Sequence, residues 1–373
     1  MRNTAWAITL NGPVMPLYVR SLGVDIVYWG VLATAISAGL FMEVLWGTIL
    51  DRVNRRLLIL AALVGTSLLY PLYTIKALLP LFIVLQFVFG AVNVVIGLTT
   101  RAVIAEDLPP SSSGFYMSLW FFFATLGAIS GPVIGTYIAS SYGYEYSFYS
   151  SSTIVLAVAA FYGFVILRDK RPTIVRESNT VSLFTGVKKL IRVGYLSKVY
   201  LITMLAILGT SCISSYLPIY ATERVGMATI AVGGMMTTAA LGRLIATPLI
   251  GRFSDRVDKK KLLAAILGGA SVFFLLFLAV TNSAELTLVA FGVSLCFSSG
   301  VLSIAIHSAT APKELSGMAL GLYGTFEDLG LMVGSTIFGL SWAAFGPPSI
   351  FVIASGTALV AALLALSLGH GNQ

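Results

Sequence analysis

The segment Gly47-Thr48-Ile49-Leu50-Asp51-Arg52-Val53-Asn54-Arg55-Arg56 joins two long apolar stretches and carries one acid and three arginines. Its glycine, aspartate, first arginine and valine recur 204 residues later in Gly251-Arg252-Phe253-Ser254-Asp255-Arg256-Val257-Asp258-Lys259-Lys260-Lys261. Only 10% of all residues are charged, so both segments stand out from their surroundings. A charged hairpin between apolar helices, used twice at one spacing, predicts a duplicated membrane protein.

The composition points to the same class. Hydrophobic residues make up 57% of the chain and the mean hydropathy is +0.93, whereas a soluble domain has about 45–50% apolar and about 25% charged residues. We therefore expect an all-α membrane protein with many spanning helices. The net charge of +8 is concentrated in short loops, so it indicates membrane topology and no nucleic-acid partner.

Twelve apolar segments are long enough to cross a bilayer, which takes about 20 helical residues. The first is the weakest, because Pro13 and Pro16 interrupt it. The expected spans are 3–20, 27–49, 57–76, 79–102, 114–139, 147–167, 198–220, 227–250, 261–281, 285–306, 316–343 and 348–368.

The basic residues predict the orientation. With both termini in the cytoplasm, eighteen lysines and arginines fall on the cytoplasmic side, and only Arg20, Lys76 and Arg224 fall outside. The positive-inside rule therefore favours cytoplasmic termini in the plasma membrane.

A repeat extends well beyond the charged hairpins. Matching residues recur at offsets of 202 to 204, which predicts two six-helix bundles of the same sense, related by an axis along the membrane normal. The pairs include Pro16 and Pro218, Gly30 and Gly233, Gly97 and Gly300, Pro109 and Pro312, Gly127 and Gly330, and Gly131 and Gly334. The expected domains are an N-terminal bundle (1–167), a basic linker (168–197) and a C-terminal bundle (198–373).

The linker contains an amphipathic pattern. Leu183, Phe184, Val187, Leu190 and Ile191 recur at helical spacing, and basic residues occupy the other face. This pattern is typical of a helix lying on an anionic membrane surface. A solvated basic linker is the alternative.

In its duplicated spans, basic linker and charged hairpins, the chain resembles the major facilitator superfamily over essentially its whole length. Gly47, Asp51, Arg52, Arg55 and Arg56 match that family's signature between helices 2 and 3. The second hairpin resembles its degenerate copy, with Gly251, Asp255 and Arg256. The resemblance implies transport by alternating access.

In such a transporter, the resemblance implies that Asp51 contacts the start of helix 11 and latches the two halves when the cytoplasmic side is closed. A helix N-terminus attracts a carboxylate. The alternative is that this basic loop only sets the topology.

Helix 5 carries a second element of the resemblance. Gly127, Gly131, Pro132 and Gly135 match the pattern found in the exporters of the superfamily. Small residues four apart let helices approach closely, and ordinary close packing is the alternative interpretation. Gln86 stands where many proton-coupled members have an arginine before Gly90, so coupling through that position is not expected.

Ionisable residues inside the predicted helices are costly, which makes each a candidate for function. Glu327 lies eleven residues beyond Ser316, about 16 Å into a hydrocarbon layer about 30 Å thick. Arg243 lies eight residues before Gly251, at a depth of about 12 Å. We expect Arg243 to pair with Asp328 or Glu327, and the remaining acid to carry a proton. A static buried ion pair is the alternative.

Further polar residues lie in helices 1, 2 and 4, and helices 1 and 4 line the cavity in the family. Candidates for substrate or coupling are Asn11 in helix 1, Glu43 in helix 2 and Asn93 in helix 4. His307, near the end of helix 10, is interpreted as structural.

The sequence thus predicts a secondary transporter of a small solute, working as a monomer, most simply by proton-coupled efflux. Uptake of a sugar or organic anion is the first alternative, and a membrane sensor or scaffold without transport is the second. Phosphate-binding loops, metal-ligand clusters and nucleophile–base pairs are not evident in the sequence, so neither an enzyme nor a cofactor or metal is expected. The expected partners are the solute, protons and membrane lipids.

Overall fold

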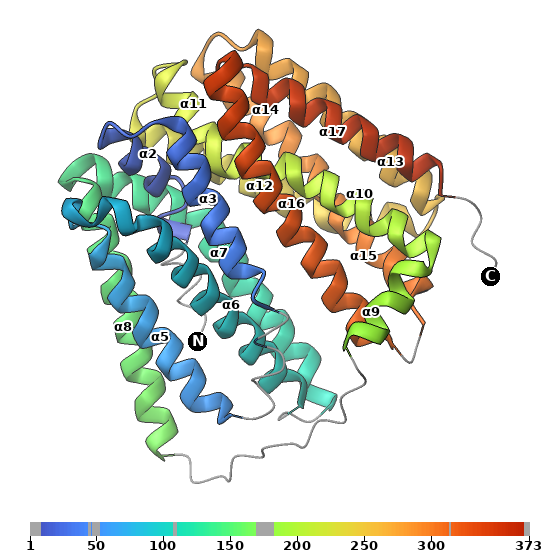
Figure 1. Cartoon of the computed structure of the whole chain (residues 1–373), viewed down its shortest axis with the longest axis horizontal. Coiled ribbons are helices and arrows are strands. Elements are labelled where there is room, and N and C mark those ends of the chain that lie inside the picture. The colour runs from blue at the N-terminus through green and yellow to red at the C-terminus, as the bar shows by residue number, and fades with distance from the viewer. Residues whose placement is uncertain are drawn as a thin grey trace. The chain divides into compact units, whose positions relative to one another are not determined.

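The computed structural model describes residues 9–43, 46, 53–106, 110–168, 183–312 and 315–368, and helices are the regular structure throughout these ranges (Figure 1). The prediction of an all-α membrane fold is confirmed. Ten of the described helical segments are long and apolar enough to cross a membrane. The short helices α2 (Val14–Ser21) and α3 (Ile26–Leu40) overlap the other two predicted spans.

The remaining elements follow in chain order. They are α5 (Arg55–Leu72), η1 (Lys76–Leu81), α6 (Phe82–Glu106), α7 (Pro110–Tyr142), α8 (Tyr144–Arg168), α9 (Leu183–Arg192), α10 (Gly194–Ser211), η2 (Cys212–Tyr216), α11 (Leu217–Glu223), α12 (Thr229–Ser254), α13 (Lys259–Leu276), η3 (Phe277–Ala279), α14 (Ser283–Cys296), α15 (Ser299–Thr310), α16 (Ser316–Phe345) and α17 (Ser349–Leu366).

The chain forms two compact units. Unit 1 draws on Met1–Gly23, Ala35–Ser178 and Ala228–Thr237, and unit 2 on Val24–Thr34, Asn179–Met227 and Thr238–Gln373. The first part of α3 therefore packs in unit 2, and the first part of α12 packs in unit 1. The domain boundaries predicted from the repeat stay a prediction.

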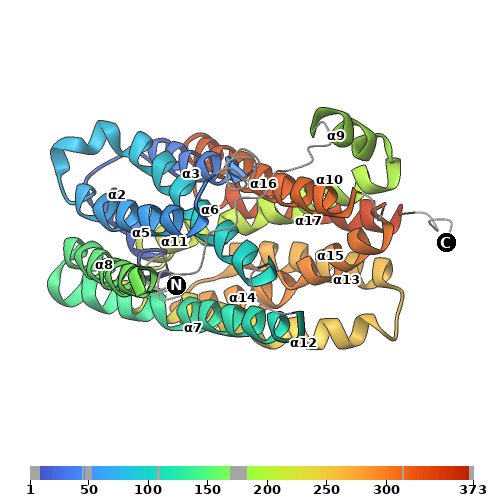
Figure 2. The same ribbon diagram turned by 90° about the horizontal axis from the view of Figure 1, so that it is seen from below.

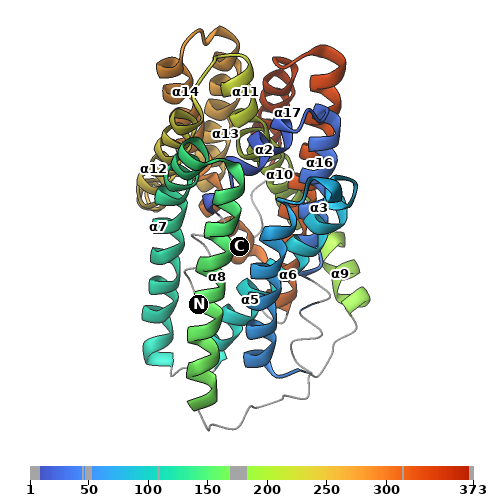
Figure 3. The ribbon, with the colours of Figure 1, turned by 90° about the vertical axis from the view of Figure 1, so that its left-hand side faces the viewer.

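Within unit 1, α5 packs along α8 and α6 (Figure 3). Aromatic rings fill one end of this packing: the ring centroids of Tyr18 and Phe148 lie 5.2 Å apart, and those of Tyr73 and Phe82 lie 5.3 Å apart. Edge-to-face pairs of this kind are favourable beyond the apolar area that they bury.

Within unit 2, α13 packs along α17, and α10 packs along α16 and α17 (Figure 1). One cluster of fully buried residues includes Ile202, Leu302 and Ala361. The amphipathic helix α9 closes one end of α10 and α16 (Figure 2). Its Leu190 is completely buried, whereas Lys188, Lys189 and Arg192 are exposed.

Both charged hairpins lead into a capped helix. The Asn54 Oδ1 atom accepts hydrogen bonds from the backbone N–H groups of Arg56 and Leu57, at 3.1 and 3.3 Å. The Asp258 Oδ1 atom, 204 residues later, accepts one from the Lys260 N–H at 2.9 Å. Capping of this kind contributes about 1 kcal/mol and fixes where each helix begins.

Candidate functional site

The predicted cytoplasmic gate is described only in part. Gly47, Asp51 and Arg52 lie outside the described residues, so the latch between Asp51 and helix 11 stays a prediction. Arg55 and Arg56 begin α5 and are partly buried. In the second copy, Gly251 lies near the end of α12, and Asp255 and Arg256 are exposed just beyond it.

The small residues of α7 permit close contact with the first helical segment. A Cβ atom on Gly131 would collide with Thr9, and one on Gly135 would collide with the Leu10 carbonyl. The Thr9 hydroxyl donates to the Gly127 carbonyl at 2.8 Å. Pro132 lies within α7, and its carbonyl accepts a hydrogen bond from Thr136 at 2.8 Å.

The repeat reproduces this contact in unit 2. A Cβ atom on Gly330 would meet the Met204 carbonyl, and one on Gly334 would meet Ser211 of α10. Thus the glycines of α16 allow close contact with α10, just as the glycines of α7 allow close contact with residues 9 and 10. A specific role of the α7 pattern in export stays a prediction.

A second pair of repeat-related contacts involves α3 and α12. In unit 2, the Thr34 hydroxyl lies 3.4 Å from the Met332 carbonyl and 2.8 Å from the Thr336 hydroxyl. In unit 1, the Thr237 hydroxyl donates to the Ile129 carbonyl at 2.6 Å. Both the two donors and the two acceptors are separated by 203 residues, so the contacts are copies of one another.

The glycines of that pair follow the same register. Gly30 packs against the backbone of Ser335 and Gly339, and Gly233 packs against Pro132 and Thr136. Sequence reasoning found the pair Gly30 and Gly233 but missed the threonines. The common spacing of 203 residues was the signal that would have found them.

A π-helix interrupts the seventh span at Cys212–Tyr216. The widened turn changes the hydrogen bonding of the backbone, and the Ser215 carbonyl accepts from the Trp29 indole N–H at 3.0 Å. Tyr216 donates its hydroxyl to the Ser335 carbonyl. Such bulges are rare and often lie at functional sites. Here the π-helix anchors the first part of α3 in unit 2.

Unit 1 has a neutral polar centre. The Asn11 amide donates to the Ser151 hydroxyl at 2.8 Å and accepts from the Ser147 hydroxyl at 2.9 Å. Asn93 donates to the Phe89 carbonyl of its own helix at 2.7 Å, and its Oδ1 atom is buried without a hydrogen-bond partner among the described residues. Glu43, just after α3, is half-buried.

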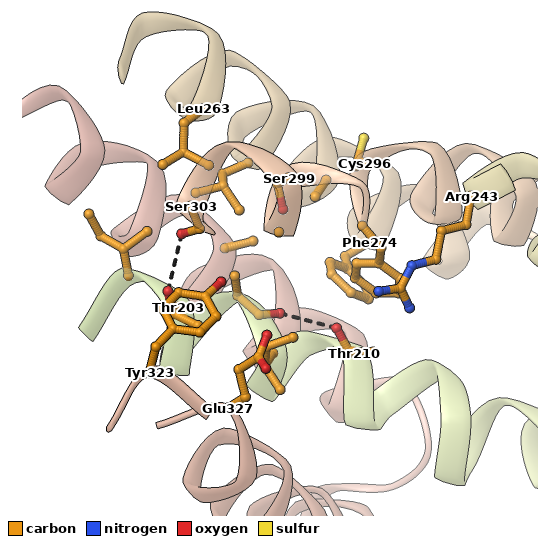
Figure 4. Close-up of a pocket in the computed structure, with 18 residues that line it drawn as sticks. Thr203, Thr210, Arg243, Leu263, Phe274, Cys296, Ser299, Ser303, Tyr323 and Glu327 are labelled. Carbon is orange, nitrogen blue, oxygen red and sulfur yellow. Dashed lines mark hydrogen bonds between the residues drawn. The ribbon is translucent and has the colours of Figure 1, made fainter. Parts of the chain in front are cut away.

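Unit 2 has a charged polar cavity (Figure 4). Arg243 of α12 and Glu327 of α16 both line it. Asp328, one position on, is not among the lining residues, because adjacent helical residues point about 100° apart. The structure therefore brings Arg243 and Glu327 to one site and selects Glu327 from the two acids. Direct pairing of their charges stays a prediction.

The other polar lining residues come from three helices. The Thr203 and Ser303 hydroxyls lie 3.1 Å apart, and Tyr323 lies beside them (Figure 4). The cavity volume is about 40 Å³, which is room for roughly three water molecules at about 10–15 Å³ each. Drug-sized sites need about 300–1,000 Å³. This cavity therefore has room for a few water molecules and is much smaller than a drug-sized site.

The whole chain is similar to known proteins. The family model of the Major Facilitator Superfamily matches residues 4–233 and 199–371. The chain is 24% identical to the multidrug resistance protein MdtG of Yersinia enterocolitica serotype O:8, over 96% of this chain and 89% of that protein. It is 23% identical to MdtG of Klebsiella pneumoniae (strain 342), over 96% and 89%.

A solved structure shares the fold. The crystal structure of the nucleoside transporter NupG matches with a TM-score of 0.77 at 13% identity, over 100% of this chain and 97% of that chain. A family match over both halves, the apolar spans and the repeated packing contacts all agree. The chain is a membrane transporter and belongs to the Major Facilitator Superfamily.

Proposed function

We propose that this protein exports small amphipathic compounds in exchange for protons. The observation that carries the proposal is Glu327, an acid on a membrane-spanning helix, at a cavity that fits a few water molecules and also contains Arg243. A carboxyl group at such depth is costly unless it serves transport. Glu327 takes a proton from one side and gives it up on the other.

Arg243 weakens the binding of the proton to the Glu327 carboxylate. Its positive charge favours the ionised form of Glu327 and helps the proton to leave. A water-sized cavity admits the proton but not the exported compound. The substrate then uses a separate site, and the two repeat halves, 1–167 and 198–373, alternate the access of that site to the two sides of the membrane.

The direction and substrate class come from the relatives. The MdtG proteins are multidrug resistance proteins by name, and the glycine and proline pattern of α7 resembles that of exporters. Both support efflux of compounds that are chemically diverse. We further propose a monomer in the plasma membrane with cytoplasmic termini, and α9 lying on anionic lipids through Lys188, Lys189 and Arg192.

The alternative is uptake of an organic anion. It is favoured by one observation: Arg243 is exposed as well as lining the cavity, so it can offer its charge to an anionic solute. In that case an anion competes with Glu327 for the guanidinium, and solute and proton move in the same direction.

Proteoliposomes distinguish these functions. Purified protein is reconstituted with ethidium as an amphipathic cation and pyranine as an internal pH reporter, and a pH gradient is imposed. We expect ethidium to move against the proton flow. Glu327→Gln lowers the rate of the coupled movement about 100-fold, equivalent to about 2.7 kcal/mol, while the matched neighbour variant Asp328→Asn retains it. Coupled transport that survives both changes would end the proton-carrier proposal. Movement of solute and proton in the same direction would favour uptake.

A further inference from the structure

A cluster of polar aromatic side chains adjoins the cavity in unit 2, and one of its members, Tyr323, also lines the cavity. Its members are Tyr200 of α10, His307 of α15 and Tyr323 of α16. The His307 Nε2 atom lies 3.3 Å from the Tyr200 hydroxyl, and the ring centroids of His307 and Tyr323 are 5.3 Å apart. His307 is only 1% exposed. The three side chains therefore form one buried cluster.

The three helices that build this cluster also supply the cavity. Thr203 is three residues from Tyr200, Ser303 is four from His307, and Glu327 is four from Tyr323. Residues at these spacings lie on one face of a helix. Two stacked layers result. One contains Glu327 with the two hydroxyls, and the other contains His307 with the two tyrosines.

One polar atom of the second layer is unpaired in the described structure. The His307 Nδ1 atom is buried without a hydrogen-bond partner among the described residues, whereas the Tyr323 hydroxyl interacts with the Thr203 and Ser303 side chains at the cavity. Buried polar groups are nearly always paired, so this exception needs a reason. Histidine and tyrosine side chains can both accept and release protons.

The cluster also lies close to one end of the bundle. His307 is three residues from Thr310, the last residue of α15. Leu190 of α9 packs with Tyr200 and Tyr323 and covers this end. The positive-inside rule assigns this end to the cytoplasm. The cluster therefore lies between the Glu327 cavity and the cytoplasmic face.

We propose that Tyr323 and His307 form a proton pathway from Glu327 to the cytoplasm, with His307 as a second proton-binding group. This inference deepens the proposed function and depends on it. The carboxylic acid of Glu327 releases its proton to cavity water. The Tyr323 hydroxyl oxygen accepts a proton from cavity water, and the original hydroxyl proton of Tyr323 moves on to His307.

His307 completes the transfer. Its neutral ring accepts the proton on Nδ1, becomes imidazolium, and returns to neutral by passing a proton from Nε2 to the Tyr200 hydroxyl 3.3 Å away, which releases its own proton toward the cytoplasmic end. One proton enters and one leaves, and the Glu327 carboxylate remains beside Arg243. The charged and titratable groups on the described helices packed around the pathway include Lys188, Lys189, Arg192, Tyr195, Lys198, Arg243, Arg252, Lys259, Lys260, Lys261 and Asp328.

The first test observes His307 directly. The chain has two histidines, so ¹³C,¹⁵N-histidine labelling of the full chain in anionic nanodiscs, with His370→Asn, leaves one ring signal. We expect this signal to change between neutral and protonated forms between about pH 5 and pH 9, a range that includes the usual histidine pKa. Its midpoint shifts by about half a pH unit or more in Glu327→Gln, because a nearby charge is removed.

Asp328→Asn is the matched control, and it leaves the midpoint within about 0.2 pH units, because Asp328 does not line the cavity. A His307 signal that stays neutral throughout would overturn the pathway. So would a midpoint that is the same with and without Glu327. This measurement needs no transport activity, so it decides the pathway even if the wild type proves to move no protons, an outcome that would overturn only the proposed function.

The second test separates proton movement from solute binding. His307→Gln and Tyr323→Phe are compared for pH-driven ethidium efflux and for ethidium exchange at equal pH on both sides. We expect efflux to fall about tenfold or more and exchange to stay within about twofold, because exchange needs no net proton release. Ser355→Ala, which removes a hydroxyl 2.8 Å from Ser271 away from the pathway, is the control. Wild-type efflux in both pathway variants would overturn the proposal.

Discussion

The polar centre of unit 1 is neutral and hydrogen-bonded within itself, whereas that of unit 2 is charged. Asn11 forms hydrogen bonds with two serine hydroxyls of α8, those of Ser147 and Ser151. In unit 2, Glu327, Arg243, Tyr323 and His307 surround or adjoin a water-sized cavity. The first arrangement stabilises a bundle, and the second can bind and release a proton.

The repeat shows which residues make the polar centres of the two units different. At the spacing of 203 residues, Glu327 corresponds to Ala124, Arg243 to Leu40 and His307 to Ile104. The glycines and threonines that join the helices have counterparts at that spacing, but the ionisable groups do not. The scaffold is therefore shared, whereas Glu327, Arg243 and His307 occur in one copy only. Burying charges in an apolar layer is costly, which favours having them only once.

The largest expected effect comes from removing the acid of the unit 2 cavity, which is the main difference between the polar centres of the two units. Glu327→Gln should lower the rate of proton-driven efflux about 100-fold, equivalent to about 2.7 kcal/mol in the activation barrier. Placing an acid in unit 1 with Ala124→Glu should not restore the rate, since Leu40 offers no positive charge there. Initial rates in proteoliposomes check this. Recovery in the double variant would show that the two centres are interchangeable.

The next effect tests the shared scaffold. Gly334→Val should lower the free energy of unfolding by about 1–3 kcal/mol, because the added side chain overlaps Ser211 and the Leu208 carbonyl. Gly131→Val should act similarly in unit 1, against Thr9. Thermal unfolding in detergent measures both. Gly321→Ala in the same helix is the control, because no atom lies within 4 Å of the added carbon. Equal unfolding temperatures for Gly334→Val and Gly321→Ala would contradict the close-packing interpretation.

A third effect separates stability from coupling. Asn11→Leu removes the hydrogen bonds between Asn11 and the Ser147 and Ser151 hydroxyls, at a cost of about 1–3 kcal/mol. We expect a lower unfolding temperature, but an unchanged ratio of protons to ethidium moved. The control Ser140→Ala removes an exposed hydroxyl that bonds only within its own helix. A changed ratio in Asn11→Leu would place coupling in unit 1 as well.

The smallest effect sharpens the comparison between the repeat-related contacts. Thr237→Val removes one hydrogen bond, to the Ile129 carbonyl, and should cost about 0.5–1.5 kcal/mol. Thr34→Val should cost more, because Thr34 also contacts Thr336 and the Gly30 carbonyl, both at 2.8 Å. Chemical denaturation of each variant tests the order. A larger loss of unfolding free energy in Thr237→Val than in Thr34→Val would show that the number of hydrogen bonds does not determine how much each contact contributes to stability.

The sequence by itself determined the membrane class, the helical fold, the duplication and the family. These follow from apolar length, the spacing of charged loops and local capping, all of which are properties of short segments. It also placed Glu327, Asp328 and Arg243 at similar depths, because helical rise is constant.

Only the tertiary structure decided which of those residues meet. Glu327 was selected over Asp328 because rotation about the helix axis depends on packing against α10 and α15. His307 was predicted to be structural, and its place beside Tyr200 and Tyr323 became visible only when three helices distant in sequence were brought together. Side-chain contacts between helices depend on the rotation and offset of each helix, and these are set by close packing of the whole bundle.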